Sequence, residues 1–166
     1  MVARINTVAF EGVEARDVGV QVQISPGVPA FTIVGLGDKA VGESRERVRA
    51  ALTAIGLALP PKRITVNLAP ADLPKEGSHY DLPIALALMT ALGVIPQDAM
   101  DGLCVLGELG LDGTIAPVTG ALPAAIAANA ADRGLVCPET CGPEAAWAGD
   151  IEIIAPATLL EFVNHI

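Results

Sequence analysis

One stretch of the chain, residues 63–88, constrains the fold most: RITVNLAPADLPKEGSHYDLPIALAL. It predicts a buried strand over residues 64–68, a proline-rich loop, and an apolar helix that begins near Leu82. The loop carries five polar or charged side chains between these two hydrophobic elements: Lys75, Glu76, Ser78, His79 and Asp81. The carboxyl end of a strand is a common place for a site in α/β proteins. The loop is therefore a candidate active site, a candidate binding loop, or an inherited site that has lost its activity.

The rest of the chain predicts a mixed α and β domain. Strands are expected near residues 3–10, 18–25, 30–35, 63–68, 103–110, 134–137 and 151–154. Helices are expected near residues 38–56, 81–94, 120–132, 141–148 and 157–165. Strands come first and helix–strand alternation follows, which favours an α+β arrangement with a sheet covered by helices. No linker or repeat interrupts the 166 residues, so a single domain, 1–166, is expected.

Composition argues against a membrane protein and a disulfide scaffold. The longest apolar stretch, residues 82–96, is shorter than the roughly 20 residues that a membrane span needs. The N-terminus has no apolar segment of the kind found in signal peptides, so a cytoplasmic location without membrane contact is expected. The three cysteines, Cys104, Cys137 and Cys141, have no second Cys or His pair beside them that would complete a zinc site. We expect reduced thiols in the core.

Charge is unevenly distributed. Of the formal net charge of −9, residues 101–166 carry −8 and residues 1–100 carry −1. Such an acidic chain is a poor stand-alone nucleic-acid binder, because binding to phosphates needs a basic face. Any contact with DNA or a partner is expected from the few basic side chains: Arg45, Arg47, Arg49, Lys62, Arg63 and Lys75. A solvated helix face remains the simpler interpretation of the three arginines.

Three motifs bear on enzymatic activity. Residues 35–40, GLGDKA, match the pattern G-x-G-x-x-A of dinucleotide sites, but a tight strand-to-helix turn explains the glycines equally well. No Walker A sequence is present, so the chain lacks the usual means of binding ATP for hydrolysis. Ser78, His79 and Asp81 have the residue types of a catalytic triad, yet working triads bring together residues that are distant in sequence.

Three blocks of sequence together resemble a known family: FTIVGLGDKAVGESRERVRAAL, RITVNLAPADLPKEGSHYDLPIALAL and LGELGLDGTIAPVTGALPAA. They are similar to the N-terminal domain of the YifB/ComM family, the magnesium-chelatase-like AAA+ ATPases. The resemblance extends over essentially the whole chain. It implies a Lon-protease-domain-like fold, within the ribosomal protein S-five domain-2-like class.

The resemblance also implies that catalysis is missing. Lon proteases use a Ser–Lys dyad, and the family pattern aligns the serine with His79 and the lysine with Leu122. Leucine can neither lower the pKa of a serine nor accept its proton, so the dyad chemistry is absent. This chain is therefore expected not to be an enzyme.

The family context implies a larger machine. An AAA+ ATPase module is expected downstream of this domain, with ATP and Mg bound there and no cofactor in this chain. The expected partners are that module, sister subunits in a hexameric ring, and DNA through the full-length protein during branch migration in natural transformation. Two alternatives stay open: a divergent Ser/His hydrolase that uses Ser78 or His79, and a pure oligomerisation module.

Overall fold

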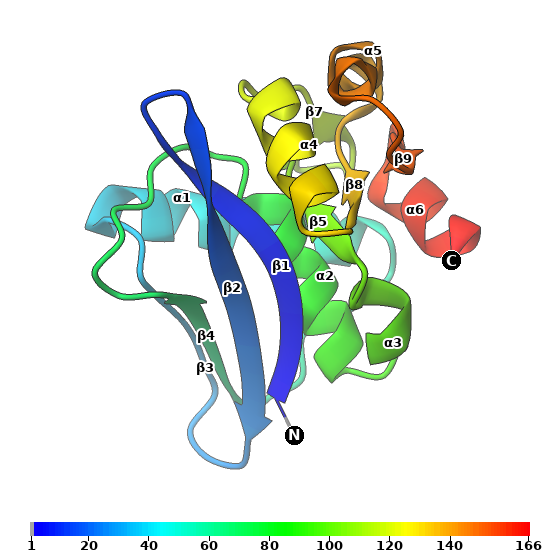
Figure 1. Ribbon diagram of the computed structural model, residues 1–166. Coiled ribbons are helices and arrows are strands. Elements are labelled where there is room, and N and C mark those ends of the chain that lie inside the picture. The colour runs from blue at the N-terminus through cyan, green and yellow to red at the C-terminus, as the bar shows by residue number, and fades with distance from the viewer. Residues whose placement is uncertain (1) are drawn as a thin grey trace.

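The computed structural model describes residues 2–166, and its central feature is one mixed sheet (Figure 1). The strands are β1 (Val2–Glu11), β2 (Glu14–Ser25), β3 (Ala30–Val34), β4 (Arg63–Ala69), β5 (Leu103–Val105), β6 (Glu108–Leu109), β7 (Ile115–Ala116), β8 (Gly134–Val136) and β9 (Ile153–Ile154). Seven of them form the sheet in the order β3-β4-β2-β1-β5-β8-β9, while β6 and β7 form a separate hairpin. β2 is antiparallel to β1 and β4, and the other pairings in the sheet are parallel.

Helices cover both faces of this sheet. They are α1 (Asp38–Ala54), α2 (Asp81–Ala91), α3 (Gln97–Met100), α4 (Ala121–Ala130), α5 (Gly142–Ala145) and α6 (Leu159–His165), with 3₁₀ turns η1 (Glu139–Cys141) and η2 (Ala146–Ala148). Side chains of α1, α2 and α6 join one buried hydrophobic cluster, and those of α4 and α5 join a second. In Figure 1, α2 lies behind the sheet and α4 in front of it. The arrangement confirms the predicted α+β class.

Helix α2 is the centre of the larger cluster. Every residue of α2 except the last is buried. A helix that is apolar on all sides is stable only inside a hydrophobic core. This explains why the apolar helix predicted from the sequence is buried. Its one charged residue, Asp81, stands at its first position and therefore needs partners within the fold.

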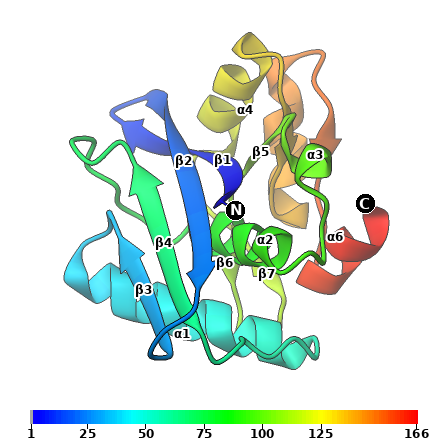
Figure 2. The same ribbon diagram turned by 90° about the horizontal axis from the view of Figure 1, so that it is seen from below.

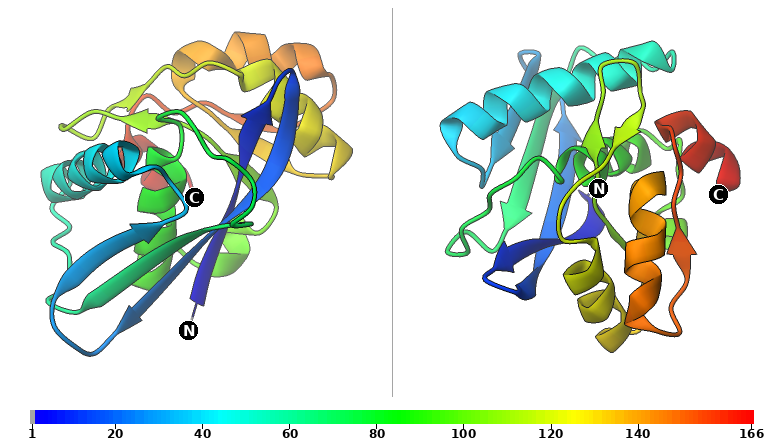
Figure 3. Two further views of the ribbon diagram at one scale, coloured as in Figure 1. Left: turned by 90° about the vertical axis from the view of Figure 1, so that its left-hand side faces the viewer. Right: turned by 90° about the horizontal axis from the view of Figure 1, so that it is seen from above.

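The predicted strand over residues 103–110 is wrong as a single element, because the chain leaves the sheet after β5. Gly107 lies across the start of α2: its N–H donates to the carbonyl of His79 (3.0 Å), and its own carbonyl accepts from the N–H of Leu82 (2.9 Å). A Cβ at Gly107 would lie 3.0 Å from Ile115 and 3.1 Å from Leu82, so glycine is needed for this crossing. The chain then forms the β6–β7 hairpin, which stands beside α1 (Figure 3).

The other differences from the predicted elements concern short segments. The predicted helix over 141–148 is a succession of short turns, η1, α5 and η2, in a segment that contains Pro138 and Pro143. β7 and α3 were not predicted, since each has at most four residues.

Between residues 2 and 166, none of the helices combines the length and apolarity needed to cross a bilayer.

Candidate functional site

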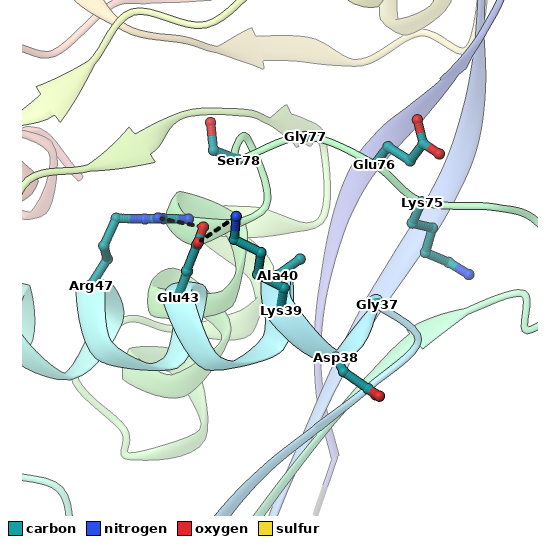
Figure 4. A pocket seen from close by; sticks show the side chains of 10 residues that line it. All are labelled: Gly37, Asp38, Lys39, Ala40, Glu43, Arg47, Lys75, Glu76, Gly77 and Ser78. Atoms are coloured by element: carbon teal, nitrogen blue, oxygen red, sulfur yellow. Dashed lines mark ion pairs between the residues drawn. The ribbon is translucent and has the colours of Figure 1, made fainter.

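The loop between β4 and α2 faces the N-terminal half of α1 across an open groove of about 510 Å³ (Figure 4). The loop side contributes residues 75–78, and α1 with the residue before it contributes the other side. The groove is lined by Gly37, Asp38, Lys39, Ala40, Glu43, Arg47, Lys75, Glu76, Gly77 and Ser78. Along α1, Glu43 forms ion pairs with two basic side chains: its carboxylate oxygens lie 3.9 Å from Lys39 Nζ and 3.8 Å from Arg47 Nη1.

Asp81 is held at the bottom of this region by four hydrogen bonds. Arg47 donates from Nε to Oδ2 (2.5 Å) and from Nη2 to Oδ1 (3.2 Å). Ser44 Oγ donates to Oδ1 (2.7 Å), and the N–H of Leu109 donates to Oδ2 (3.1 Å). Burial raises the pKa of Asp81, although the hydrogen bonds from Arg47 and Ser44 oppose this shift. The carboxylate therefore joins α1, α2 and β6, and no acceptor position remains for a catalytic partner.

His79 is packed in the interior. Its side chain is buried, and Nε2 donates to the carbonyl of Val8 (2.7 Å). Its ring stacks obliquely with the rings of Tyr80 (4.0 Å between centroids) and Phe10 (5.1 Å). Desolvation lowers the pKa of His79, so the imidazole is held neutral. Because Nε2 is committed to Val8, only Nδ1 could take a proton, and it lies against Gly77.

Ser78 does not combine with its neighbours. It lines the groove, whereas His79 and Asp81 are buried. None of the hydrogen bonds found across residues 2–166 joins Ser78 Oγ to either of them. The residue types of a triad are therefore present without the triad geometry.

Phe10 packs beside one of the two positions that the resemblance aligns with the Lon dyad. Its ring lies 5.1 Å from that of His79, and a Cβ at Gly120 would lie 2.4 Å from Phe10 Cζ. Leu122 follows as the second residue of α4, and its N–H donates to Glu144 (2.8 Å). The ring of Phe10 thus packs against both the loop and the residue that precedes α4.

Two of the predicted DNA or partner contacts are engaged within the chain. Arg47 is bound to Asp81, which raises the pKa of its guanidinium. Lys75 is buried, and its Nζ donates to the carbonyls of Pro70 and Leu73. Desolvation lowers the pKa of Lys75. Both side chains are thus already engaged within the fold, and a contact of either with phosphate stays a prediction.

The other four predicted contacts gather at the β3 edge of the sheet. Arg49 lies over the ring of Phe31 (5.8 Å), and Arg45 Nη1 donates to the Phe31 carbonyl at 3.5 Å. Arg49 and Lys62 line a recess of about 180 Å³ there. Arg63 begins β4 and pairs with Ala30 of β3. The folded chain thus brings together basic residues from a helix and from a segment that follows it in sequence.

The glycine pattern of residues 35–40 has a structural cause. Gly35 has a φ of 108°, and a Cβ there would lie 2.7 Å from the carbonyl oxygen of Leu68. Only glycine permits this approach between the turn and β4. Within residues 2–166 no three His, Cys, Asp or Glu side chains are grouped to hold a metal ion.

Comparison with known proteins identifies the family. The family described as subunit ChlI of Mg-chelatase matches residues 20–141. The competence protein ComM of Haemophilus influenzae is 40% identical over 158 residues, which cover 95% of this chain and 31% of ComM. The uncharacterized protein YifB of Escherichia coli is 45% identical over 132 residues, covering 80% of this chain and 26% of YifB. The chain belongs to the YifB/ComM family.

Another YifB/ComM relative is the uncharacterized protein YifB of Salmonella typhimurium, 42% identical over 151 residues, which cover 84% of this chain and 30% of that protein. The chain thus spans about a third of the length of the curated YifB and ComM proteins it matches. The resemblance inferred from the three sequence blocks is confirmed at the level of the family.

Sequence reasoning missed the residues that hold the loop in place. Ser44 and Arg47 bind Asp81, and Phe10 packs on His79. A usable signal existed for the first two, because they are three residues apart on one face of the predicted helix, and a carboxylate heading an apolar helix needs donors. Nothing in the sequence indicated Phe10, whose position depends on the pairing of distant strands.

Proposed function

We propose that this chain is a non-catalytic accessory domain of a longer magnesium-chelatase-like AAA+ ATPase that resembles ComM. In that protein it would help to assemble a ring of subunits or to guide DNA, in support of branch migration and natural transformation. ATP and Mg would bind to the ATPase module and not to this domain. We also propose that the domain has a Lon-protease-like frame and works in the cytoplasm.

One observation supports the non-catalytic part of this proposal: three of the five polar or charged side chains of the loop are engaged within the fold. Asp81 accepts four hydrogen bonds, His79 is bound to Val8, and Lys75 is bound to two carbonyls. A general base must be free to reach the proton it abstracts, and none of these groups is. The membership in a family that includes a competence protein supports the DNA-processing part.

The DNA-contact part is tested by binding measurements on the full-length protein. Changing Arg45→Ala together with Arg49→Ala should weaken DNA binding and reduce the dependence of log affinity on log salt concentration. With fewer phosphate contacts, the protein releases fewer counterions from the DNA when it binds. The double change Arg4→Ala and Arg16→Ala removes the same charge away from the β3 edge and serves as the control. An unchanged affinity and an unchanged salt dependence would exclude DNA contact through these arginines.

The hydrolase alternative is tested on this chain directly. Incubation with a serine-reactive probe and with unfolded protein should give neither labelling nor turnover, since the neighbouring His79 is bound to Val8 and no hydrogen bond within residues 2–166 joins Ser78 to a base. Labelling that disappears in Ser78→Ala would favour the hydrolase and contradict the accessory-domain proposal.

A further inference from the structure

Uncompensated positive charge gathers at the β3 end of the sheet. We call Arg45, Arg49, Lys62 and Arg63 the basic edge. Only Arg49 has an ion-pair partner there, Glu46 at 3.8 Å, and that pair is mostly exposed. Across residues 2–166, Arg45, Lys62 and Arg63 take part in none of the ion pairs. On a chain with a net charge of −9, this edge is a local exception.

Uncompensated negative charge gathers at the opposite end. Residues 134–166 contain no Lys or Arg. The five exposed carboxylates in this segment, which we call the acidic end, are Glu139, Glu144, Asp150, Glu152 and Glu161. No ion pair in the described part of the chain involves any of them. They belong to the region of β8, β9 and α6, and β9 is the last strand at the edge opposite β3 (Figure 1; Figure 2).

Each end also exposes apolar surface beside its charges. At the basic edge, Val28 is 83% exposed, and the recess of about 180 Å³ is lined partly by Pro29 and Pro60. At the acidic end, Leu160 on α6 is 49% exposed and Ile166 is 44% exposed. Apolar contact surrounded by charged groups is the usual composition of an interface between proteins.

We propose that the basic edge of one copy of this chain docks on the acidic end of a second copy, head to tail. The two surfaces differ and each copy carries both, so the contact is heterologous and repeats from copy to copy, as in a ring or an open chain. The inference rests on the proposed function and deepens it, because it assigns the ring-assembly role to two named surfaces.

A second copy fits these observations better than DNA does. DNA would neutralise the basic edge but would leave the acidic end unpaired, and its phosphates would be repelled by the negative charge of the remaining surface. A second copy of the chain compensates both ends at once. Such charge complementarity increases the rate of association and selects the partner and its orientation.

The test uses charge reversal in this chain, followed by sedimentation velocity over a range of protein and salt concentrations. One variant carries Arg49→Glu and Lys62→Glu, and the other carries Glu152→Lys and Glu161→Lys. The wild-type chain should self-associate at low salt and dissociate as ionic strength rises from about 0.05 M to about 0.5 M, where charges are screened within a few ångströms. Each variant alone should associate at least about tenfold more weakly, because like charges now face each other.

Mixing the two variants should restore association, since the reversed edge of one now matches the reversed end of the other. The control Arg4→Glu combined with Arg16→Glu reverses the same number of charges as Arg49→Glu with Lys62→Glu, at exposed positions on β1 and β2, and should leave association unchanged. A wild-type chain that stays monomeric, or a mixture that is not restored, would overturn the proposal. So would variants that lose DNA binding while self-association is unchanged, which would assign the basic edge to nucleic acid. Branch migration by the full-length protein measures the proposed function separately, so the two can fail independently.

Discussion

At the scale of single residues, the contact between α1 and α2 depends on the carboxylate of Asp81. The side chain of Asp81 is 1% exposed and that of Arg47 is 23% exposed, so neither charge is fully hydrated. Removing one partner of a buried pair leaves the other charge without compensation. Ser44 contributes a single hydrogen bond to the same carboxylate, which is worth less.

Arg47→Met should therefore lower the free energy of unfolding by roughly 3 kcal/mol. Ser44→Ala should lower it by about 1 kcal/mol. Chemical denaturation at neutral pH measures both values. Arg45→Met is the matched control, because its guanidinium makes only one long contact, with the Phe31 carbonyl, and its effect should be small. An equal loss in Arg45→Met and Arg47→Met would show that the pair with Asp81 is not what stabilises this contact.

His79 makes stability depend on pH. Its pKa in the folded chain lies below the ordinary value of 6.5, because burial disfavours the imidazolium. The unfolded chain therefore binds this proton more tightly, and stability is lost as the pH falls from about 6.5 toward the folded pKa. His79→Gln keeps a donor for the Val8 carbonyl and should flatten this part of the stability profile. Equal profiles for wild type and His79→Gln would contradict the buried, neutral histidine.

At the scale of elements, the loop is fixed by backbone geometry as well as by its side chains. Gly77 has a φ of 104°, and a Cβ there would lie 2.9 Å from Nδ1 of His79. Gly77→Ala should destabilise the fold by about 1 to 3 kcal/mol, from an unfavourable φ and a displaced ring. Gly42 lies within α1 with open space around it, so Gly42→Ala should stabilise the chain by about 0.5 to 1 kcal/mol. Thermal unfolding of the two variants should shift in opposite directions, and a common direction would refute the assigned geometry.

His79 is buried against the ring of Phe10, so we expect that restoring the dyad residues does not restore a protease. The double change His79→Ser and Leu122→Lys should remain unlabelled by a serine-reactive probe, because the side chain at residue 79 is buried beside Phe10. The same double change combined with Phe10→Ala separates obstruction by the ring from other causes. Labelling of the double variant that depends on the new lysine would contradict this account.

The elements that could be predicted from the sequence are those whose pattern is local. Strand β4 and helices α1 and α2 were predicted within a few residues, because their apolar residues repeat at strand or helix spacing. The split of residues 103–110 between two sheets could not be predicted, since it depends on how Gly107 crosses the start of α2. The engagement of Arg47 and Lys75 was missed for a similar reason: their partners are set by tertiary packing and not by spacing. Predicting the loop as the chemically richest segment was correct for its residue types, but their exposure could not be read from the sequence.

At the scale of the whole molecule, family membership, a hydrogen-bonded loop and two oppositely charged surfaces occur together in one domain. The chain belongs to the YifB/ComM family and spans about a third of the relatives' length. Three polar side chains of the loop between β4 and α2 make internal hydrogen bonds, and the basic edge and the acidic end lie at opposite ends of one sheet. These features support the proposal that the domain contacts other subunits and does not turn over a substrate.

Branch migration of a synthetic DNA junction by the full-length protein tests the central claim most directly. We predict that removing residues 1–166 abolishes ATP-driven migration while ATP hydrolysis persists, and that Ser78→Ala and His79→Gln in the full-length protein leave migration at the wild-type rate. Migration at the wild-type rate without the domain would contradict the accessory role, and loss of migration in Ser78→Ala would contradict the claim that the domain is not catalytic.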